Sequence, residues 1–161
     1  MSNNYQIRPI SDQDRSWVSA LVRELWISDI VVVHGTIYKP AELPGFIADE
    51  NGEPLGLITY HLEEDECEIV TLDSLRESIG IGTTLVDSVR QAAKDAGCQR
   101  LWVVTSNDNL RALSFYQKRG FRINAVRPDG VTESRKVKPE IPLIGYNGIM
   151  IMDEIELETK L

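Results

Sequence analysis

The sequence predicts an α/β (α+β) fold, in which a mixed, mostly antiparallel central sheet of about six or seven strands carries helices on both faces. Three observations lead to this prediction. The amino-terminal segment is typical of a strand followed by a helix, the middle of the chain is typical of a run of antiparallel strands, and the remainder alternates strands with helices. With 161 residues, we expect a single domain over residues 1–161 whose core needs neither disulfides nor a structural metal.

The amino-terminal segment predicts a strand and an amphipathic helix. Residues 5–10 alternate as a strand does, and Ser11 provides a cap for the helix that follows. Apolar residues then recur at helical spacing from residue 12 to about residue 27. Residues 30–38 are rich in strand-forming residues but are broken by His34-Gly35, so we expect a loop with a short extended piece.

The middle of the chain predicts antiparallel strands. Residues 46–49 and 55–62 are typical of a hairpin, because Asn51-Gly52 between them is a strong turn signal. A further strand is expected over residues 67–72. Alternation along this strand predicts one face that carries Glu68, Val70 and Leu72.

The second half of the chain alternates helices with strands. Apolar residues at helical spacing predict helices over residues 80–96 and 109–119, and a glycine follows each, as is common at a helix end. The near-continuous apolar run 100–105 is typical of a strand that is covered on both faces. Two further strands are expected over residues 121–126 and 148–157, with a short helix or turn over residues 129–137 between them.

The composition argues against several classes of function. A formal net charge of −8 disfavours a broad nucleic-acid-binding surface, because contacts with phosphates need clustered Lys and Arg. The first residues are polar and no apolar run approaches the roughly 20 residues that span a bilayer, so we expect no membrane anchor and a cytoplasmic location. Cys67 and Cys98 lack the spacing of a zinc site or a disulfide framework, so we expect no metal.

The most informative segment runs from the strand over residues 67–72 to the helix start at Gly80. Gly80 and Gly82 let a ligand approach the backbone closely, and the unpaired N–H groups of a first helical turn favour an anion. Thr83 and Thr84 can add hydroxyl donors. Such a turn alone also fits tight packing. It is neither a Walker A loop nor a complete dinucleotide fingerprint, because the Gly-Lys-Ser/Thr and the third glycine are missing.

A second segment, residues 105–121, narrows the choice. The two segments together resemble the GNAT superfamily of N-acetyltransferases over roughly residues 55–126. In the first family signature, Gln/Arg-x-x-Gly-x-Gly/Ala, the two glycine positions are filled by Gly80 and Gly82. The second signature, Asn-x-x-Ala-x-x-x-Tyr-x-x-x-Gly-Phe, is filled by Asn109, Ala112, Tyr116, Gly120 and Phe121.

The sequence departs from the first signature at one position. Glu77 stands where the family has Gln or Arg, and Arg76 lies one residue earlier. Either the loop is re-spaced so that Arg76 reaches the phosphate, which is the interpretation that we favour, or backbone amides bind the anion alone.

The resemblance implies the acyl-CoA N-acyltransferase (GNAT) fold and an acyltransferase that uses acetyl-CoA as cosubstrate. It implies direct attack, in a ternary complex, by a primary amine of an unidentified small-molecule or peptide acceptor. The pantetheine arm would bind the backbone of residues 72–74, and the pyrophosphate would rest on residues 80–83. The residues implied in binding acetyl-CoA are Leu72, Asp73, Ser74, Arg76, Ile79, Gly80, Ile81, Gly82, Thr83, Thr84, Asn109, Ala112 and Tyr116.

The resemblance also implies catalytic roles. Tyr116 is implied as the acid that protonates the leaving thiolate, and its position also suits an aromatic packing residue. Asn109 would either cap its helix or bind the pantetheine. Glu68 resembles in position the glutamate that acts as base in histone-type members of the family. Asp73 and His34 are two further candidates for the base.

Other interpretations of these residues stay open. A non-catalytic module that senses acyl-CoA would keep the same fold, and a nucleotide-phosphate-binding protein would use the glycine turn alone. The basic side chains of residues 133–142 could meet the 3′-phosphate of CoA or an anionic acceptor, or they could belong to a solvated loop. A homodimer is compatible with the sequence, but no particular feature predicts one.

Overall fold

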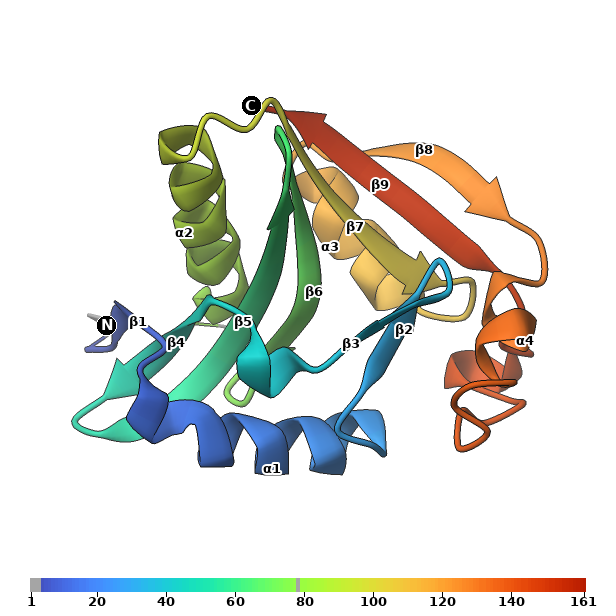
Figure 1. Cartoon of the computed structure of the whole chain (residues 1–161), viewed down its shortest axis with the longest axis horizontal. Coiled ribbons are helices and arrows are strands. Elements are labelled where there is room, and N and C mark those ends of the chain that lie inside the picture. The colour runs from blue at the N-terminus through green and yellow to red at the C-terminus, as the bar shows by residue number, and fades with distance from the viewer. Residues whose placement is uncertain (1–3, 78) are drawn as a thin grey trace.

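A computed structural model describes residues 4–77 and 79–161. Seven strands form one sheet in the order β1-β4-β5-β6-β7-β9-β8, and β2 and β3 form a separate two-stranded sheet (Figure 1). The strands are β1 (Gln6–Pro9), β2 (Val31–Val33), β3 (Thr36–Tyr38), β4 (Gly45–Glu50), β5 (Glu53–Glu63), β6 (Glu66–Ser74), β7 (Arg100–Ser106), β8 (Arg122–Arg127) and β9 (Glu154–Lys160). The helices are α1 (Arg15–Trp26), α2 (Ile81–Asp95), α3 (Leu110–Lys118) and α4 (Gly130–Ser134). The predicted mixed sheet flanked by helices is confirmed.

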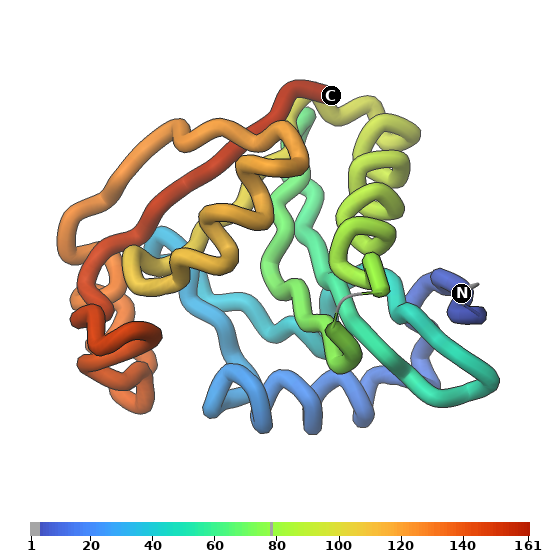
Figure 2. The backbone as a smooth tube through the Cα atoms, turned by 180° about the vertical axis from the view of Figure 1, so that it is seen from behind, coloured from blue at the N-terminus to red at the C-terminus, as the bar shows by residue number. Residues whose placement is uncertain are grey.

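Helices cover both faces of the sheet because α1 and α2 are amphipathic and each buries its apolar stripe. Leu57 and Ile58 are neighbours on β5 and therefore face opposite sides. Leu57 packs in a core cluster with Val18 and Val22 of α1, whereas Ile58 packs in the cluster that contains Leu85 of α2. Seen from behind, α2 lies to the right and α3 to the left of β5 and β6 (Figure 2), and both helices pack in the cluster that contains Leu85, so they cover the same face of the sheet.

Strands β6 and β7 run parallel and then separate. Their pairing extends from Glu66 opposite Arg100 to Ile69 opposite Val103, and beyond these residues the two strands diverge toward α1 (Figure 1). All other neighbouring pairs of the large sheet are antiparallel. The separation leaves room between two strands in the middle of the sheet.

The expected alternation of residues 67–72 is wrong after Val70. The register between β5 and β6 shifts there: Ile69 pairs with Tyr60 and Thr71 pairs with Thr59, so Val70 is the extra residue of a β-bulge. Leu72 consequently packs with the α2-side cluster that contains Ile69. It does not share the face of Glu68 and Val70.

Residues 31–38 form a hairpin, where the sequence analysis expected a loop with a short extended piece. Val33 pairs with Thr36, which leaves His34 and Gly35 as a two-residue turn. Both have positive φ, 50° and 77°, as the mirror-image turns of tight hairpins require. Because each strand has only three residues, alternation along the sequence is too short to reveal them.

The last strand also begins later than expected. β9 starts at Glu154, not near residue 148. The preceding stretch contains a 3-10 helix, Tyr146–Gly148, and a single antiparallel bridge between Ile144 and Met150. Asn147 and Gly148 have positive φ, which interrupts extended backbone there.

Candidate active site

Two cavities lie beside the end of β6. The first, of about 750 Å³, is called here the α2 cavity. It is lined by the amino-terminal turn of α2 and by α3, including Gly80, Ile81, Gly82, Thr83, Phe115 and Arg119. The second, of about 620 Å³, is called the hairpin cavity and is lined in part by Val31, Val32, Val33, Val104 and Val131.

The two cavities meet around Tyr116. Both are lined by Leu72, Asp73, Asn109, Ala112, Tyr116 and Tyr146. The first five of these residues were predicted from the sequence to bind the cosubstrate, and they come from β6 and from the start and middle of α3. Tyr146 was not predicted, because nothing in its local pattern relates it to the glycine turn. Two separate ligands could therefore meet at one point, beside a phenol and a carboxylate.

The amino terminus of α2 is open to an anion. Gly80 occupies the N-cap position with a φ of 80°. Because glycine has no side chain, it cannot accept a hydrogen bond from the amides of the first helical turn as other N-cap residues do. The first amides of an α-helix lack acceptors within the helix, so those of residues 81–83 remain available. Thr84 donates its hydroxyl to the carbonyl of Gly80 at 2.9 Å and contacts Tyr5 Oη at 2.9 Å. Thr84 is therefore turned away from the α2 cavity, and it does not line it.

Among the described residues, Arg76, Arg111 and Arg119 line the α2 cavity. The sequence analysis named only Arg76, and Arg119 is the least exposed of the three. Arg76 forms an ion pair with Glu50 at 2.8 Å. Arg119 donates to Thr83 Oγ1 at 2.8 Å, and its guanidinium lies 3.7 Å from the centre of the Phe115 ring. Phe115 and Arg119 are four residues apart on or just after α3, a spacing that places two side chains on one face. That spacing was the available signal for Arg119.

The position of the family Gln or Arg is occupied by an exposed ion pair. Glu77 contacts Arg111 at 2.7 Å, and their side chains are 65% and 79% exposed. Residue 77 and residue 111 both line the α2 cavity. A carboxylate there is neutralised by the neighbouring arginine, so this departure from the signature does not leave an isolated negative charge at the cavity.

Tyr116 is a buried acid. Its side chain packs edge-on against Phe115 and Phe121, with ring centres 5.1 and 5.3 Å away. Burial raises the pKa of Tyr116 above its ordinary value, and the charge of Asp73 raises it further. The phenol therefore stays protonated over the physiological pH range. It packs in an aromatic cluster and also lines both cavities, so the two interpretations of this residue are compatible.

Asn109 acts as the N-cap of α3. Its side-chain Oδ1 accepts a hydrogen bond from the amide of Ala112 at 3.1 Å. Asp108, one residue earlier, is 2% exposed and accepts hydrogen bonds from Ser106 Oγ and from the amide of Tyr146. These bonds hold Tyr146 where the two cavities meet.

Among the described residues, Asp73 is the one carboxylate that lines both cavities. Burial raises its pKa to about 6, and the indole N–H of Trp26, which donates to both carboxylate oxygens at 3.3 and 3.2 Å, opposes that rise. A group with this pKa is largely ionised at neutral pH yet can accept a proton. Asp73 is thus suited to act as a base toward a ligand in either cavity.

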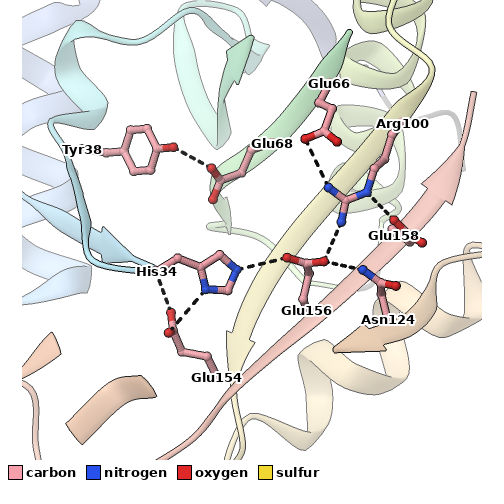
Figure 3. Close-up of polar contacts among 9 residues, drawn as sticks. All are labelled: His34, Tyr38, Glu66, Glu68, Arg100, Asn124, Glu154, Glu156 and Glu158. Atoms are coloured by element: carbon pink, nitrogen blue, oxygen red, sulfur yellow. Dashed lines mark hydrogen bonds and ion pairs between the residues drawn. The ribbon is translucent and has the colours of Figure 1, made fainter. Parts of the chain in front are cut away.

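Glu68 and His34 lie outside the lining of both cavities. Glu68 is 2% exposed and accepts a hydrogen bond from Tyr38 Oη at 2.7 Å (Figure 3). Burial raises the pKa of Glu68 to about 7. His34 contacts Glu154 and Glu156 of β9 through its backbone and its ring. Neither candidate for the base therefore contacts a cavity directly.

Two basic side chains of residues 133–142 form hydrogen bonds with the backbone of this chain. Arg135 donates to the backbone carbonyls of Ile141 and Pro142, and Lys138 donates to that of Ile30 at 2.8 Å. Lys138 is 5% exposed and lines the hairpin cavity. These contacts favour a structural role for Arg135, and they place one lysine at the wall of the hairpin cavity.

The sequence pattern of the acetyltransferase (GNAT) family matches residues 10–121. This chain belongs to the GNAT acetyltransferase family. Two proteins of Bacillus subtilis (strain 168), described as uncharacterized proteins YdhI and YxbD, are similar to it. The first is 47% identical over 131 residues, which cover 81% of this chain and 82% of that protein. The second is 40% identical over 156 residues, which cover 96% of this chain and 98% of that protein.

Solved structures share the fold of this GNAT acetyltransferase. An IAA acetyltransferase from Bacillus cereus superposes with a TM-score of 0.75 at 23% identity, covering 98% of this chain and 99% of that one. A GNAT family acetyltransferase from Elizabethkingia anophelis, solved with acetyl-CoA bound, superposes with a TM-score of 0.74 at 23% identity, covering 99% and 100%. At this identity the likeness concerns the fold alone.

Neither a metal centre nor a membrane-spanning helix is found in the described part of this GNAT chain. Within residues 4–77 and 79–161, no group of three or more His, Cys, Asp or Glu side chains is arranged to hold a metal ion. No helix in the same residues is long and apolar enough to cross a bilayer.

Proposed function

We propose that this GNAT acetyltransferase is an N-acetyltransferase that moves the acetyl group of acetyl-CoA to a primary amine of a small-molecule or peptide acceptor, by direct attack in a ternary complex. The observation that carries the proposal is the meeting of two cavities at Tyr116 and Asp73, one of which ends at the open amides of α2. A cytoplasmic location is part of the proposal, and the net charge of −8 supports the absence of a nucleic-acid partner.

In the proposal, acetyl-CoA binds along the α2 cavity. The pyrophosphate rests on the amides of residues 80–83, where the helix dipole favours negative charge. Arg119 and Arg76 supply the positive side chains, and the backbone of residues 72–74 receives the pantetheine. Arg76 would have to leave Glu50 to do so, because the two form an ion pair here.

The acceptor occupies the hairpin cavity. Its walls are largely apolar, and the acidic side chains that line it are Asp73, Asp108 and Glu154. This lining supports an amine that has an apolar body. The charge of Asp73 attracts the amine to the point where the cavities meet.

The proposed reaction uses two groups of the chain. The neutral amine attacks the thioester carbonyl carbon, its nitrogen–carbon bond forms and the carbon–sulfur bond breaks. Asp73 accepts the proton that the amine loses, and Tyr116 donates its proton to the leaving sulfur. The products are the N-acetylated acceptor and CoA as the free thiol. Glu68 could serve as base only through intervening groups, since it lines neither cavity, and this role stays a prediction.

The proposed function is tested by measuring thiol release from acetyl-CoA against amino acids, polyamines, aminoglycosides, peptide amines and apolar primary amines. We expect release with at least one amine, together with formation of its N-acetyl product by mass spectrometry. A chain that binds CoA but acetylates none of these amines would instead support the acyl-CoA-sensing module. Binding of ATP in competition with CoA would support the nucleotide-phosphate-binding alternative.

Arg119→Ala is expected to weaken CoA binding by about tenfold, because it removes a positive charge beside the amides that receive the pyrophosphate. Calorimetric titration with CoA measures the change. The matched control is Arg122→Ala on β8, which removes an exposed arginine that lines neither cavity. Equal affinity in both variants would place the diphosphate elsewhere.

Gly82→Val is expected to weaken CoA binding by at least about tenfold. A Cβ on Gly82 would already lie 3.2 Å from two atoms of the Phe115 ring, so a larger side chain would crowd Phe115 at the α2 cavity, which both residues line. The CoA titration is paired with a thermal unfolding curve, which shows whether the variant stays folded. A folded variant with unchanged affinity would contradict the proposed phosphate site.

A further inference from the structure

The hairpin β2–β3 forms one wall of the hairpin cavity but belongs to a sheet of its own. Val31, Val32 and Val33 line the cavity, and β2 pairs with β3 within a two-stranded sheet. A two-stranded hairpin alone is marginally stable in water. Its position on the large sheet therefore depends on contacts made by its side chains and its turn.

Apolar packing supplies one part of that attachment. Val31 and Val33 form a core cluster with Val70 of β6, against which Trp102 and Val104 of β7 also pack. Such packing is independent of pH over the range in which carboxylic acids and histidine titrate. It holds the middle of the hairpin against the sheet.

Polar contacts at both ends of the hairpin also attach it to the large sheet (Figure 3). At the turn, the amide of His34 donates to Glu154 at 3.1 Å, and Nε2 lies 3.1 Å from a carboxylate oxygen of Glu156. The imidazole also stacks on Trp102, with ring centres 5.7 Å apart. At the end of β3, Tyr38 donates to Glu68 Oε1 at 2.7 Å.

The carboxyl group of Glu68 is placed where its charge is costly. It is 2% exposed, and Oε2 has no hydrogen-bond partner among the described residues. Burying an ionised oxygen without a partner is unfavourable, whereas a protonated oxygen tolerates the same site better. Burial accordingly raises the pKa of Glu68 to about 7, although the bond from Tyr38 opposes the rise.

The charges around Glu68 add to this cost. Negative charges on Glu63 of β5 and on Glu154 and Glu156 of β9 all raise its pKa. The titratable and charged groups that face it from the packed elements are His34 at the hairpin turn, Tyr38 on β3, His61 and Glu63 on β5, and Glu154 and Glu156 on β9. The nearby cation Arg100 is already bound to Glu66, Glu156 and Glu158. No described cation therefore compensates Glu68 directly.

We infer that Glu68 is a positioning residue: its carboxyl, buried and bonded by Tyr38, keeps the β2–β3 hairpin against the sheet and so shapes the acceptor wall, and its ionisation loosens that wall. Ionisation strengthens the bond from Tyr38, but it leaves Oε2 charged and buried without a described partner, and this cost is the larger of the two. The part that concerns the acceptor rests on the proposed function. The seating of the hairpin itself does not.

The direction of the pH effect follows from the raised pKa of Glu68. Between its ordinary value and about 7, the folded protein holds a proton on Glu68 that the free acid would lose, so the stabilisation is full at low pH and is lost as pH rises through about 7. At about pH 8 roughly nine in ten Glu68 side chains would be ionised. Hydrogen exchange of the hairpin amides reports the loosening without any need for activity.

The experiment compares wild type, Glu68→Gln and Tyr38→Phe at about pH 6 and about pH 8 by hydrogen exchange, corrected for intrinsic rates. In wild type we expect protection of the amides of residues 31–38 to fall by about tenfold at the higher pH. Glu68→Gln keeps an acceptor for Tyr38 but cannot ionise, so its protection should stay the same at both pH values. Tyr38→Phe should exchange faster already at about pH 6. Equal protection of wild-type residues 31–38 at both pH values would overturn the inference.

Kinetics with an acceptor separate positioning from catalysis. For wild type, the KM for the acceptor should rise several-fold with pH while kcat changes little. Glu68→Gln should remove that rise in KM and keep kcat. A loss of about 100-fold in kcat in Glu68→Gln would instead identify Glu68 as the base. If no amine is acetylated, the exchange measurement still decides whether Glu68 holds the hairpin.

Discussion

Tyr116→Phe is expected to lower kcat by about 100-fold or more, which corresponds to about 2.7 kcal/mol of activation free energy. The substitution removes the phenol that we propose as proton donor to the leaving sulfur, and it keeps the ring that packs against Phe115 and Phe121. Affinity for CoA should stay within about twofold of wild type, because no described amide of the α2 turn depends on the hydroxyl. Steady-state kinetics with a saturating acceptor and a CoA titration measure the two quantities.

The control for this substitution is Tyr146→Phe. Tyr146 also lines both cavities, but its side chain is 68% exposed, so loss of its hydroxyl should change kcat little. An equal loss in both variants would indicate a general effect of polarity where the cavities meet. An unchanged kcat in Tyr116→Phe would exclude the phenol as the required acid.

Titration of Tyr116 should not be visible in a plot of kcat/KM against pH. Its pKa is raised well above the ordinary value by burial, so the phenol remains protonated throughout the range in which the protein is assayed. Any limb in a plot of kcat/KM against pH must then come from another group or from the acceptor.

Asp73→Asn is expected to lower kcat/KM by about 100-fold or more and to remove the acidic limb of its pH profile. The pKa of Asp73 is raised to about 6, so the wild-type carboxylate is ionised above this value and becomes protonated below it. Activity that depends on Asp73 as base should therefore rise with pH through about 6. The amide of Asn still accepts the hydrogen bond from Trp26, which preserves the local packing.

Trp26→Phe serves as the companion variant. The indole N–H of Trp26 lowers the pKa of Asp73 against the effect of burial, so its loss should raise that pKa further. The acidic limb should then move to higher pH while the plateau is retained. If the limb stays in place in Asp73→Asn, the titrating base is another residue.

The residues of the two signatures could be predicted from the sequence because their roles are local. Gly80 needs a left-handed backbone at a helix start, and Asn109 caps the helix that it precedes. Tyr116 lies two helical turns beyond Asn109, and that spacing fixes its direction. Periodicity likewise predicted α1, α2 and α3 and most strands of the large sheet.

Features that depend on partners distant in the sequence could not be predicted in this way. The hairpin cavity combines Val31 with Glu154, which no local pattern connects. In the sequence, Glu68 is one alternating position of a predicted strand. Only the three-dimensional structure shows that it lines neither cavity. The position of Arg119 at the α2 cavity depends on its hydrogen bond to Thr83 and its contact with the Phe115 ring.

The β-bulge at Val70 has a geometric consequence for the acids of β6. Glu68 and Asp73 are five positions apart, and in a regular strand an odd separation places two side chains on opposite sides. The additional residue turns the second half of β6 over, so that one acid meets the β3 tyrosine and the other meets the indole of α1 on the same side of the sheet. The bulge also bends the strand just where its parallel neighbour departs. Chain length at this point, as well as residue type, is therefore under constraint: natural variants should tolerate substitution at residue 70 far better than an insertion or deletion there.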